Sequence, residues 1–329
     1  MITASFKPIR GSGSPSHRHI KKTIQGSPKT LHLPQICKVK GDISSVLIVR
    51  QESPWNKYRP AFLCDIAGEV IIATNRSNPS RLQAVRQYPK ADAERLIQRF
   101  GYLDHVNILS SRDCYIDSNS IYVFVDDFPL TMSNIVSSPG IYPTDTELAA
   151  IMSQVRLIGS KFSDSLTKKV LDGLCYLRRF GLSYRSFSCQ KILLGTDGRV
   201  KIACLDQCTE LSPMESHRIY FKAIPSVLMA LMQKHEKDGG ITGVEDLDRW
   251  PVDSDAFAFL AAASTETIDS LKMVKPSVSD ISHSLDMTEA FQHPLITARF
   301  QSTEDLVMLA RHALCAGVAT SRCYVAPQR

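Results

Sequence analysis

The stretch that decides the fold reads VLDGLCYLRRFGLSYRSFSCQKILLGTDGRVKIACLD and runs from Val170 to Asp206. Its first apolar residues recur at helical spacing and form one face; they are Val170, Leu171, Leu174, Leu177 and Phe180. Gly181 follows at a position where a left-handed residue ends a helix. Two short apolar runs, Lys191–Leu194 and Val200–Ala203, flank the turn signal GTDG and predict a β-hairpin. We therefore expect a helix, a loop, a hairpin and a second loop.

The order of these elements resembles the catalytic region of eukaryotic protein kinases. In that family the helix leads into His-Arg-Asp-x-x-x-x-Asn, and the hairpin leads into Asp-Phe-Gly. Here the first motif reads YRSFSCQK, from Tyr184 to Lys191, and the second reads CLD, from Cys204 to Asp206. The resemblance implies an α+β fold with two lobes, a small and mainly antiparallel β N-lobe and a larger helical C-lobe.

The positions of the two motifs match the family, but the residues that carry their chemistry are replaced. Ser186 stands where the family has its catalytic base, Lys191 where an Asn holds a metal, and Cys204 where an Asp holds Mg²⁺. Phosphoryl transfer depends on metal ions that neutralise phosphate, and these hard cations prefer oxygen ligands. A serine hydroxyl is also too weak a base to accept the substrate proton. We predict no catalytic residue and no metal site, and treat as degenerate the positions Tyr184, Arg185, Ser186 and Lys191.

Segments ahead of this unit resemble the first strands of a kinase N-lobe. They are Ala61–Ile66, Glu69–Thr74 and Leu82–Tyr88, and Val46–Val49 precedes them as a further strand. In the family, a loop with three glycines lets the backbone approach the phosphates, and Gly68 is the glycine that remains here. Arg86 replaces the third-strand lysine, which keeps the charge but not the shape of an ammonium group.

A short helix is predicted at Asp92–Gly101. In this resemblance Glu94 is the candidate for the helix glutamate that pairs with the third-strand lysine. It lies about half a turn too early for that role, so we expect no pair between Glu94 and Arg86.

The hinge between the lobes is expected at Asp126–Phe128, after a hairpin formed by Arg112–Asp117 and Ile121–Val125. The family binds adenine there through backbone groups. The resemblance implies weak nucleotide contacts at Gly68, Arg86, Asp126, Phe128 and Lys191. No cofactor is expected, apart from ATP bound without Mg²⁺ between the charges of Arg86 and Lys191.

Apolar spacing predicts further helices on both sides of the central unit. They are Pro129–Val136, Glu147–Gln154, Ile219–Lys234, Asp253–Ala263, Thr288–Gln292 and Asp305–Cys315. Residues 155–169 interrupt an otherwise continuous helix, and we interpret them either as an inserted surface loop or as translated intron sequence. Residues 273–287 are a second candidate for an insertion of this kind. Residues 207–218 are too short for a folded activation loop.

The net charge of +6 is unevenly distributed along the 329 residues. Residues 1–41 carry eight Lys or Arg and no Asp or Glu, which leaves −2 for the rest of the chain. This segment is rich in Ser, Pro and Gly and predicts disorder. It is either a solvated extension or an electrostatic tether to an acidic partner, nucleic acid or an anionic membrane.

The nine cysteines are scattered through the chain without metal-ligand spacing. We therefore expect reduced thiols in an intracellular protein, cytoplasmic or nuclear. The sequence shows no secretory signal and no apolar run long enough to span a bilayer.

These patterns together predict four segments: a disordered basic tail (1–42), an N-lobe (43–126), a C-lobe (127–300) and a C-terminal helix with a tail (301–329). The expected function is that of a pseudokinase, a kinase-like domain without phosphotransfer that binds unidentified protein partners as a scaffold or regulatory module. The alternative is an atypical or weak ATP-dependent Ser/Thr protein kinase, in which Asp206 or Asp197 supplies the metal carboxylate. The third possible function is metal-independent nucleotide binding.

Overall fold

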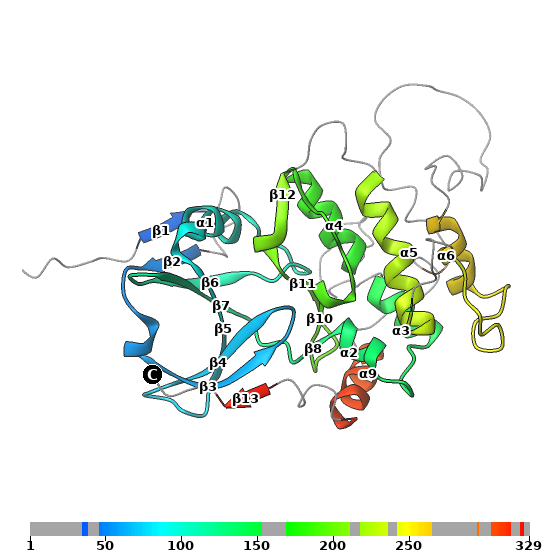
Figure 1. Ribbon diagram of the computed structural model, residues 1–329, viewed down its shortest axis with the longest axis horizontal. Coiled ribbons are helices and arrows are strands. Elements are labelled where there is room, and N and C mark those ends of the chain that lie inside the picture. The colour runs from blue at the N-terminus through cyan, green and yellow to red at the C-terminus, as the bar shows by residue number, and fades with distance from the viewer. Residues whose placement is uncertain are drawn as a thin grey trace, which may run out of the picture. The chain divides into compact units, whose positions relative to one another are not determined.

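A computed structural model describes residues 35–38, 46–152, 169–210, 218–235, 242–264, 295, 304–316 and 323–325. All of them belong to one compact unit, Pro34–Arg329. Within this part of the chain the class is α+β, with a mainly antiparallel sheet and several helices (Figure 1).

The largest sheet has eight strands. They are β1 (Gln35–Lys38), β2 (Val46–Arg50), β3 (Tyr58–Asp65), β4 (Glu69–Asn75), β5 (Leu82–Pro89), β6 (Ser111–Ile116), β7 (Ser120–Val125) and β13 (Cys323–Val325). The spatial order is β1-β2-β6-β7-β5-β4-β3-β13. Strands β2 and β6 run parallel, whereas the other neighbours are antiparallel.

Two smaller sheets accompany the helices. One contains β8 (Leu130–Thr131), β10 (Ile192–Leu194) and β11 (Val200–Ile202), and the other contains β9 (Leu182–Tyr184) and β12 (Cys208–Glu210). The described α-helices are α1 (Ala93–Tyr102), α2 (Met132–Ser137), α3 (Asp145–Met152), α4 (Lys169–Arg179), α5 (Arg218–Gln233), α6 (Asp255–Ser264) and α9 (Glu304–Cys315). Helix α3 packs against α4, α6 and α9, and α5 packs against α6.

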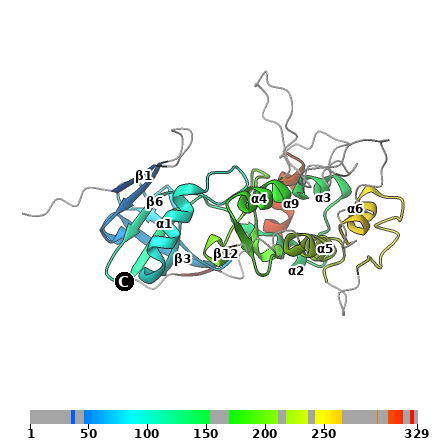
Figure 2. The ribbon, with the colours of Figure 1, turned by 90° about the horizontal axis from the view of Figure 1, so that it is seen from above.

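The two faces of the large sheet are both covered. Helix α1 lies along one face (Figure 2) and buries Leu96 and Phe100 in the main hydrophobic core. On the other face Tyr122 and neighbouring aromatic residues form a second cluster. Trp55, in the short 3₁₀ turn η1 (Pro54–Asn56), meets Tyr122 edge to face, with 5.4 Å between ring centroids. These contacts fix the strands that carry the candidate site.

The central unit forms as its sequence predicts. The apolar helix is α4, and Gly181 ends the turn after it with a φ of 69° while its N–H donates to the Arg178 carbonyl at 2.8 Å. Strands β10 and β11 pair antiparallel around the GTDG turn. A left-handed glycine and a tight turn are local features, so they are readable without knowledge of the tertiary structure.

Two expectations about local structure are wrong. Gln35–Lys38 pairs with β2, although the composition of residues 1–42 predicts disorder. The segment Pro129–Val136 does not begin as a helix, because Leu130 and Thr131 pair with β10 as strand β8. Helix α2 starts only after Thr131, whose N–H and hydroxyl both donate to the Asn134 side chain.

The expectation of reduced thiols is wrong for one cysteine. Cys64 in β3 is disulfide-bonded and 5% exposed. Cys114, Cys189, Cys204, Cys208 and Cys315 lie outside any disulfide. The fold decides which cysteines meet, so spacing along the chain carries no sign of the disulfide at Cys64.

Other predictions fall outside the described residues. They concern residues 1–34 of the basic tail, the suspected insertions 155–168 and 273–287, the predicted helix 288–292 and residues 211–217 of the segment 207–218. Among the described helices, none has the length and apolar character needed to cross a membrane.

We predict that Gly173→Ala destabilises the protein, although alanine normally stabilises a helix relative to glycine by about 1 kcal/mol. A Cβ at this buried position in α4 would lie 2.8 Å from Ile202 Cδ1 and 3.3 Å from the Asn107 carbonyl oxygen. Overpacking of this kind costs about 1–3 kcal/mol, measurable by urea unfolding. The matched control is Gly140→Ala, where a Cβ meets nothing within 4 Å. A stabilised Gly173→Ala variant would contradict this packing of α4 on β11.

Candidate functional site

The candidate site is organised around the side chain of Arg86 in β5. Arg86 is 5% exposed, and its guanidinium reaches the turn between β3 and β4. Its Nη2 donates to the Ile66 carbonyl at 2.7 Å, and its Nη1 donates to the Ala67 carbonyl at 2.8 Å. Gly68 completes this turn with a φ of 93°, a conformation that suits glycine. Arg86 therefore lies beside Gly68, where a Cβ would be 3.8 Å from its Nη1, and its hydrogen bonds go to the turn itself.

Two residues with strained backbones touch each other at this point. Ala67 has a φ of 54° and Cys204 a φ of 61°, a left-handed conformation that costs non-glycine residues about 1–2 kcal/mol. The Cys204 thiol donates to the Ala67 carbonyl at 3.2 Å. Strained backbone often lies at functional sites. The β3–β4 turn is thus held by both Arg86 and Cys204, and it contacts the start of the segment after β11.

The segment after β11 is also held by helix α1. It forms the short 3₁₀ turn η4 (Leu205–Gln207). Arg99 Nη1 donates to the Leu205 carbonyl at 2.7 Å, and Arg95 Nη1 donates to the Asp206 carbonyl at 2.9 Å. The Tyr88 hydroxyl donates to the Asp206 carboxylate at 3.4 Å. Two arginines of one helix therefore bind η4 through its backbone.

Glu94 lies on the exposed side of α1. The hydrogen bonds that the structure gives Arg86 go to the turn carbonyls. The Arg86 Nε is buried without a hydrogen-bond partner among the described residues. A buried guanidinium that binds only neutral carbonyls keeps much of its charge uncompensated.

In the loop Tyr184–Lys191, two polar side chains donate hydrogen bonds to backbone carbonyls of the protein. Tyr184 is buried, and its hydroxyl donates to the Ala203 carbonyl at 2.6 Å. The Lys191 ammonium donates to the Ser186 carbonyl and lies 4.9 Å from the centre of the Tyr184 ring. Arg185 and the Ser186 side chain are exposed. Lys191 thus forms its hydrogen bond within its own loop.

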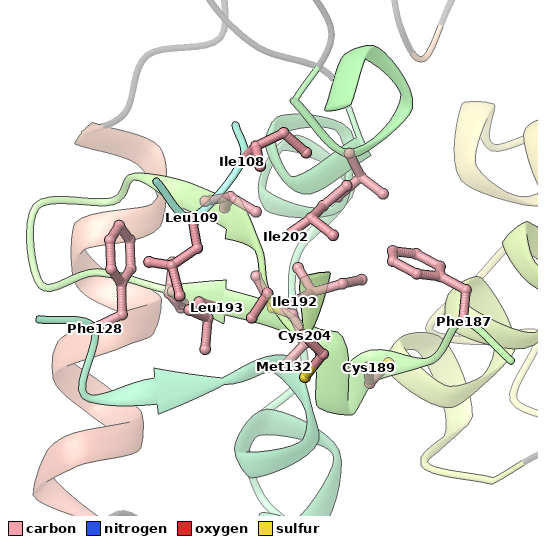
Figure 3. Close-up of a cluster of buried hydrophobic side chains, with 14 of the residues drawn as sticks. Ile108, Leu109, Phe128, Met132, Phe187, Cys189, Ile192, Leu193, Ile202 and Cys204 are labelled. Carbon is pink, nitrogen blue, oxygen red and sulfur yellow. The ribbon is translucent and has the colours of Figure 1, made fainter. Parts of the chain in front are cut away.

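The predicted hinge is attached to the β10–β11 hairpin. The carboxylate of Asp126 accepts a hydrogen bond from Lys201 in β11 at 3.0 Å, and the lysine is almost fully buried. Phe128 is also buried, and its ring lies beside Leu109 and Leu193 in the apolar cluster of Figure 3. The ring would lie 3.2 Å from a Cβ at Gly195, so the glycine leaves room for it.

The thiols beside η4 are poor metal ligands in their protonated state. Burial raises the pKa of Cys204 to about 11, although the Arg86 cation opposes the shift, and burial likewise raises the pKa of Cys208 to about 11. Within the described residues, no three His, Cys, Asp or Glu side chains gather in a way that could hold a metal ion.

Asp197, one of the two alternative carboxylates, belongs to the hairpin turn. Partial burial disfavours its charge, but bonds from the Arg199 N–H and guanidinium outweigh this and lower the pKa of Asp197. The Arg199 Nε lies 2.5 Å from the carboxylate. Asp206, the other alternative, faces Tyr88, and burial followed by the Asp206 charge raises the pKa of that phenol.

Sequence reasoning missed the contacts made by Arg95 and Arg99. The signal was present, because residues four apart on a helix share one face, and two arginines at this spacing suit carbonyl or anion binding. It missed the Ile66 and Ala67 carbonyls altogether, since a backbone acceptor leaves no mark in the sequence.

We predict that Arg86→Met releases the β3–β4 turn. Amide hydrogen exchange of residues 65–69 should accelerate, and the free energy of unfolding should fall by about 2–4 kcal/mol because two carbonyls lose a charged donor. Exposed Arg81, in the loop between β4 and β5, provides the control Arg81→Met, which should change neither. Unchanged exchange at residues 65–69 in Arg86→Met would contradict the role assigned to Arg86.

We also predict that the Cys204 thiol makes stability fall as the pH rises above 9. The ordinary thiol pKa is 9.0 and the folded value is about 11, so the unfolded chain loses its proton first and gains stability. Urea unfolding at pH 8 and pH 10 should show a smaller loss for Cys204→Ser than for the natural chain. Cys315→Ser, at an exposed position, is the control. Equal losses in both variants would contradict the raised pKa of Cys204.

Comparisons with known proteins agree with a kinase-like relationship for part of the chain. No family model matches it. The mitogen-activated protein kinase kinase kinase MCK1 of Pyricularia oryzae is 28% identical over 107 residues, which are 32% of this chain and 6% of that protein. The mitogen-activated protein kinase kinase kinase mkh1 of Cytospora mali is 32% identical over 111 residues, 32% of this chain and 5% of that protein. The chain thus spans about a twentieth of the length of the curated relatives it matches.

Proposed function

We propose that this chain carries a degenerate two-lobed protein kinase-like fold that binds protein partners, as a scaffold or regulatory module, without transferring phosphate. The partial similarity to kinases and the order of α4, the β10–β11 hairpin and η4 support the fold. Fold and function separate readily in such domains, so the function depends on the chemistry at Arg86, Lys191 and Cys204.

The observation that carries the proposal is the contact between Arg86 and the β3–β4 turn. Phosphate-binding loops point backbone N–H groups at the anion. Here the turn points the carbonyls of Ile66 and Ala67 at Arg86, the cation in the position of the family's phosphate-binding lysine. A triphosphate would have to remove Arg86 from both carbonyls and meet their negative ends, which is unfavourable on both counts.

The positions that would hold Mg²⁺ support the same conclusion. A protonated thiol at Cys204 and an ammonium group at Lys191 offer a divalent cation no oxygen ligand. Ser186 offers a hydroxyl where proton transfer needs a carboxylate. Cys204 and Lys191 affect metal binding and Ser186 affects proton transfer, so repair of one position would not restore phosphotransfer.

The other two functions require rearrangement at this site. An atypical kinase would need Asp206 to turn from Tyr88, or Asp197 to leave Arg199. Metal-free binding of ATP would need Arg86 and Lys191 to leave their carbonyl partners. The unpartnered Arg86 Nε favours this second candidate over the first.

The remaining parts of the proposal concern regions outside the site. We take 43–126 and 127–300 as the two lobes and an intracellular location, cytoplasmic or nuclear, for the protein. The basic residues of segment 1–41 would contact an acidic partner by charge.

We predict that ATP does not stabilise the purified chain, with Mg²⁺ or with a chelator, in a thermal unfolding assay. A ligand at a hundred times its Kd would stabilise by about 2.7 kcal/mol, so a missing shift is informative. The parallel assay is phosphate transfer to generic peptides, for which we expect no product.

Each other outcome has a distinct meaning. Stabilisation that requires Mg²⁺ would contradict the proposal and favour the atypical kinase. Equal stabilisation with and without the chelator, lost in Arg86→Met but retained in Arg81→Met, would establish the metal-free nucleotide binder instead.

A further inference from the structure

Lys234 follows the last residue of α5 and takes a backbone conformation that lysine seldom adopts. Its φ is 71°, and its N–H donates to the Ala230 carbonyl at 3.0 Å. Helices commonly end in this left-handed conformation, but usually with glycine, because a side chain there costs about 1–2 kcal/mol. Strain of this kind persists where the surroundings fix the residue. The contacts of the lysine side chain supply that constraint.

The ammonium group of Lys234 joins the end of α5 to two other segments. It donates hydrogen bonds to the Ile135 carbonyl of α2 at 2.9 Å and to the Ile141 carbonyl. Its Nζ also lies 4.2 Å from the centre of the Tyr142 ring, a distance that suits a cation–π contact. Two carbonyls and a ring face thus surround a group that has three N–H donors. Lys234 therefore holds the segment 138–142 against the end of α5.

The segment 138–142 is poorly satisfied without this lysine. The Ser138 N–H donates to the Ile135 carbonyl at 3.2 Å, and the Ile141 N–H donates to the Ser138 carbonyl at 3.3 Å, both at the long end of the usual range. The Ser138 hydroxyl is buried and has no hydrogen-bond partner among the described residues, which disfavours the closed segment. The bonds from Lys234 compensate for these weaknesses.

A second cation lies on the same aromatic ring. The guanidinium carbon of Arg249 is 3.8 Å from the centre of the Tyr142 ring. Arg249 forms its own ion pair with Asp246 at 3.2 Å, whereas Lys234 forms no ion pair with a carboxylate of the described residues. The charge of Lys234 is therefore half-buried beside a like charge and is balanced only by carbonyls and a ring.

These surroundings favour the neutral amine. Burial and then the Arg249 charge lower the pKa of Lys234 to about 8, and Cys189 opposes the shift. The adjacent charged side chains, His235 and Glu245, face each other at 4.0 Å. Roughly a fifth of the molecules therefore carry a neutral Lys234 at pH 7.4, against about one in a thousand for an ordinary lysine. A partly desolvated lysine beside another cation is an activated nucleophile.

We propose that Lys234 is a site of acyl modification by thioesters, and that acylation releases the segment 138–142 from the end of α5. The amine attacks the acyl carbon of the thioester; a C–N bond forms, the C–S bond breaks, and the leaving thiolate takes up the proton that the amine loses. The resulting amide has one N–H and no charge, so it cannot serve both carbonyls and the ring. This inference does not depend on the function proposed above.

The first experiment measures acetylation of the full chain by acetyl-coenzyme A at pH 7.4. Peptide mass spectrometry should find that Lys234 is acetylated about fivefold faster or more than Lys90, an exposed lysine. Arg249→Met removes the second cation and should slow acetylation of Lys234, whereas Arg81→Met should leave it unchanged. A rate at Lys234 no higher than that at Lys90, or one that Arg249→Met does not change, would overturn the modification site.

Amide hydrogen exchange at Ser138 and Ile141 then tests the consequence. Lys234→Gln is as uncharged as an acetylated lysine and should accelerate exchange at both amides by about tenfold or more. Lys234→Gly relieves the left-handed backbone but removes the donor, so it should accelerate exchange too and separates the side chain from the strain. The matched control is Lys90→Gln, which should change neither amide.

The acetylated natural chain provides a comparison that needs no mutation. Its exchange at Ser138 and Ile141 should match that of Lys234→Gln. Exchange that stays slow in the acetylated chain and in both Lys234 variants would overturn the role of the lysine in holding this segment.

Discussion

The bond between the Arg86 guanidinium and the carbonyls of Ile66 and Ala67 is the interaction on which the candidate site depends. A buried cation must find acceptors, because burial removes its water. In this protein the nearest acceptors belong to the β3–β4 turn. The turn is therefore held against β5 by Arg86. The Cys204 thiol donates a further hydrogen bond to the carbonyl of Ala67. The strained turn thus accepts hydrogen bonds from a buried cation and a buried thiol, although the Arg86 Nε has no hydrogen-bond partner among the described residues.

This arrangement connects distant parts of the chain. Arg95 and Arg99 of α1 bind the backbone of η4, and Cys204 just ahead of η4 binds the β3–β4 turn, so the helix and the turn are joined through the segment after β11. Asp126 and Lys201 join β7 to the hairpin in a similar way. The positions that resemble a nucleotide site are thus used for internal contacts. We propose that this closed arrangement presents surfaces to partners instead of a reactive centre.

The sequence predicted the parts of the fold that are determined locally. Helix α4, its glycine stop and the β10–β11 hairpin follow from apolar spacing and turn residues, and the predicted bounds differ from the observed ones by at most one residue. Strands β1 and β13 were not predicted, because short edge strands form only where a distant neighbour offers a free edge. The bond state of Cys64 was predicted wrongly because the fold, not the spacing along the chain, decides which cysteines meet.

The candidate site was predicted as a set of residues but not as a set of contacts. The deficits at Ser186, Lys191 and Cys204 could be read from residue types alone. That Arg86 binds backbone carbonyls could not, since a carbonyl belongs to every residue and only the fold decides which ones face a side chain. The same limit applies to the carbonyls of Leu205 and Asp206 that Arg99 and Arg95 bind.

The most direct test of this closed site is a crystal structure of the protein grown with ATP and Mn²⁺, with anomalous diffraction used to locate the metal. We expect Arg86 to remain on the Ile66 and Ala67 carbonyls and no ordered manganese between the protein and a triphosphate. An anomalous peak that bridges Asp206 or Asp197 and the γ-phosphate, with Arg86 released from the turn, would contradict the closed site.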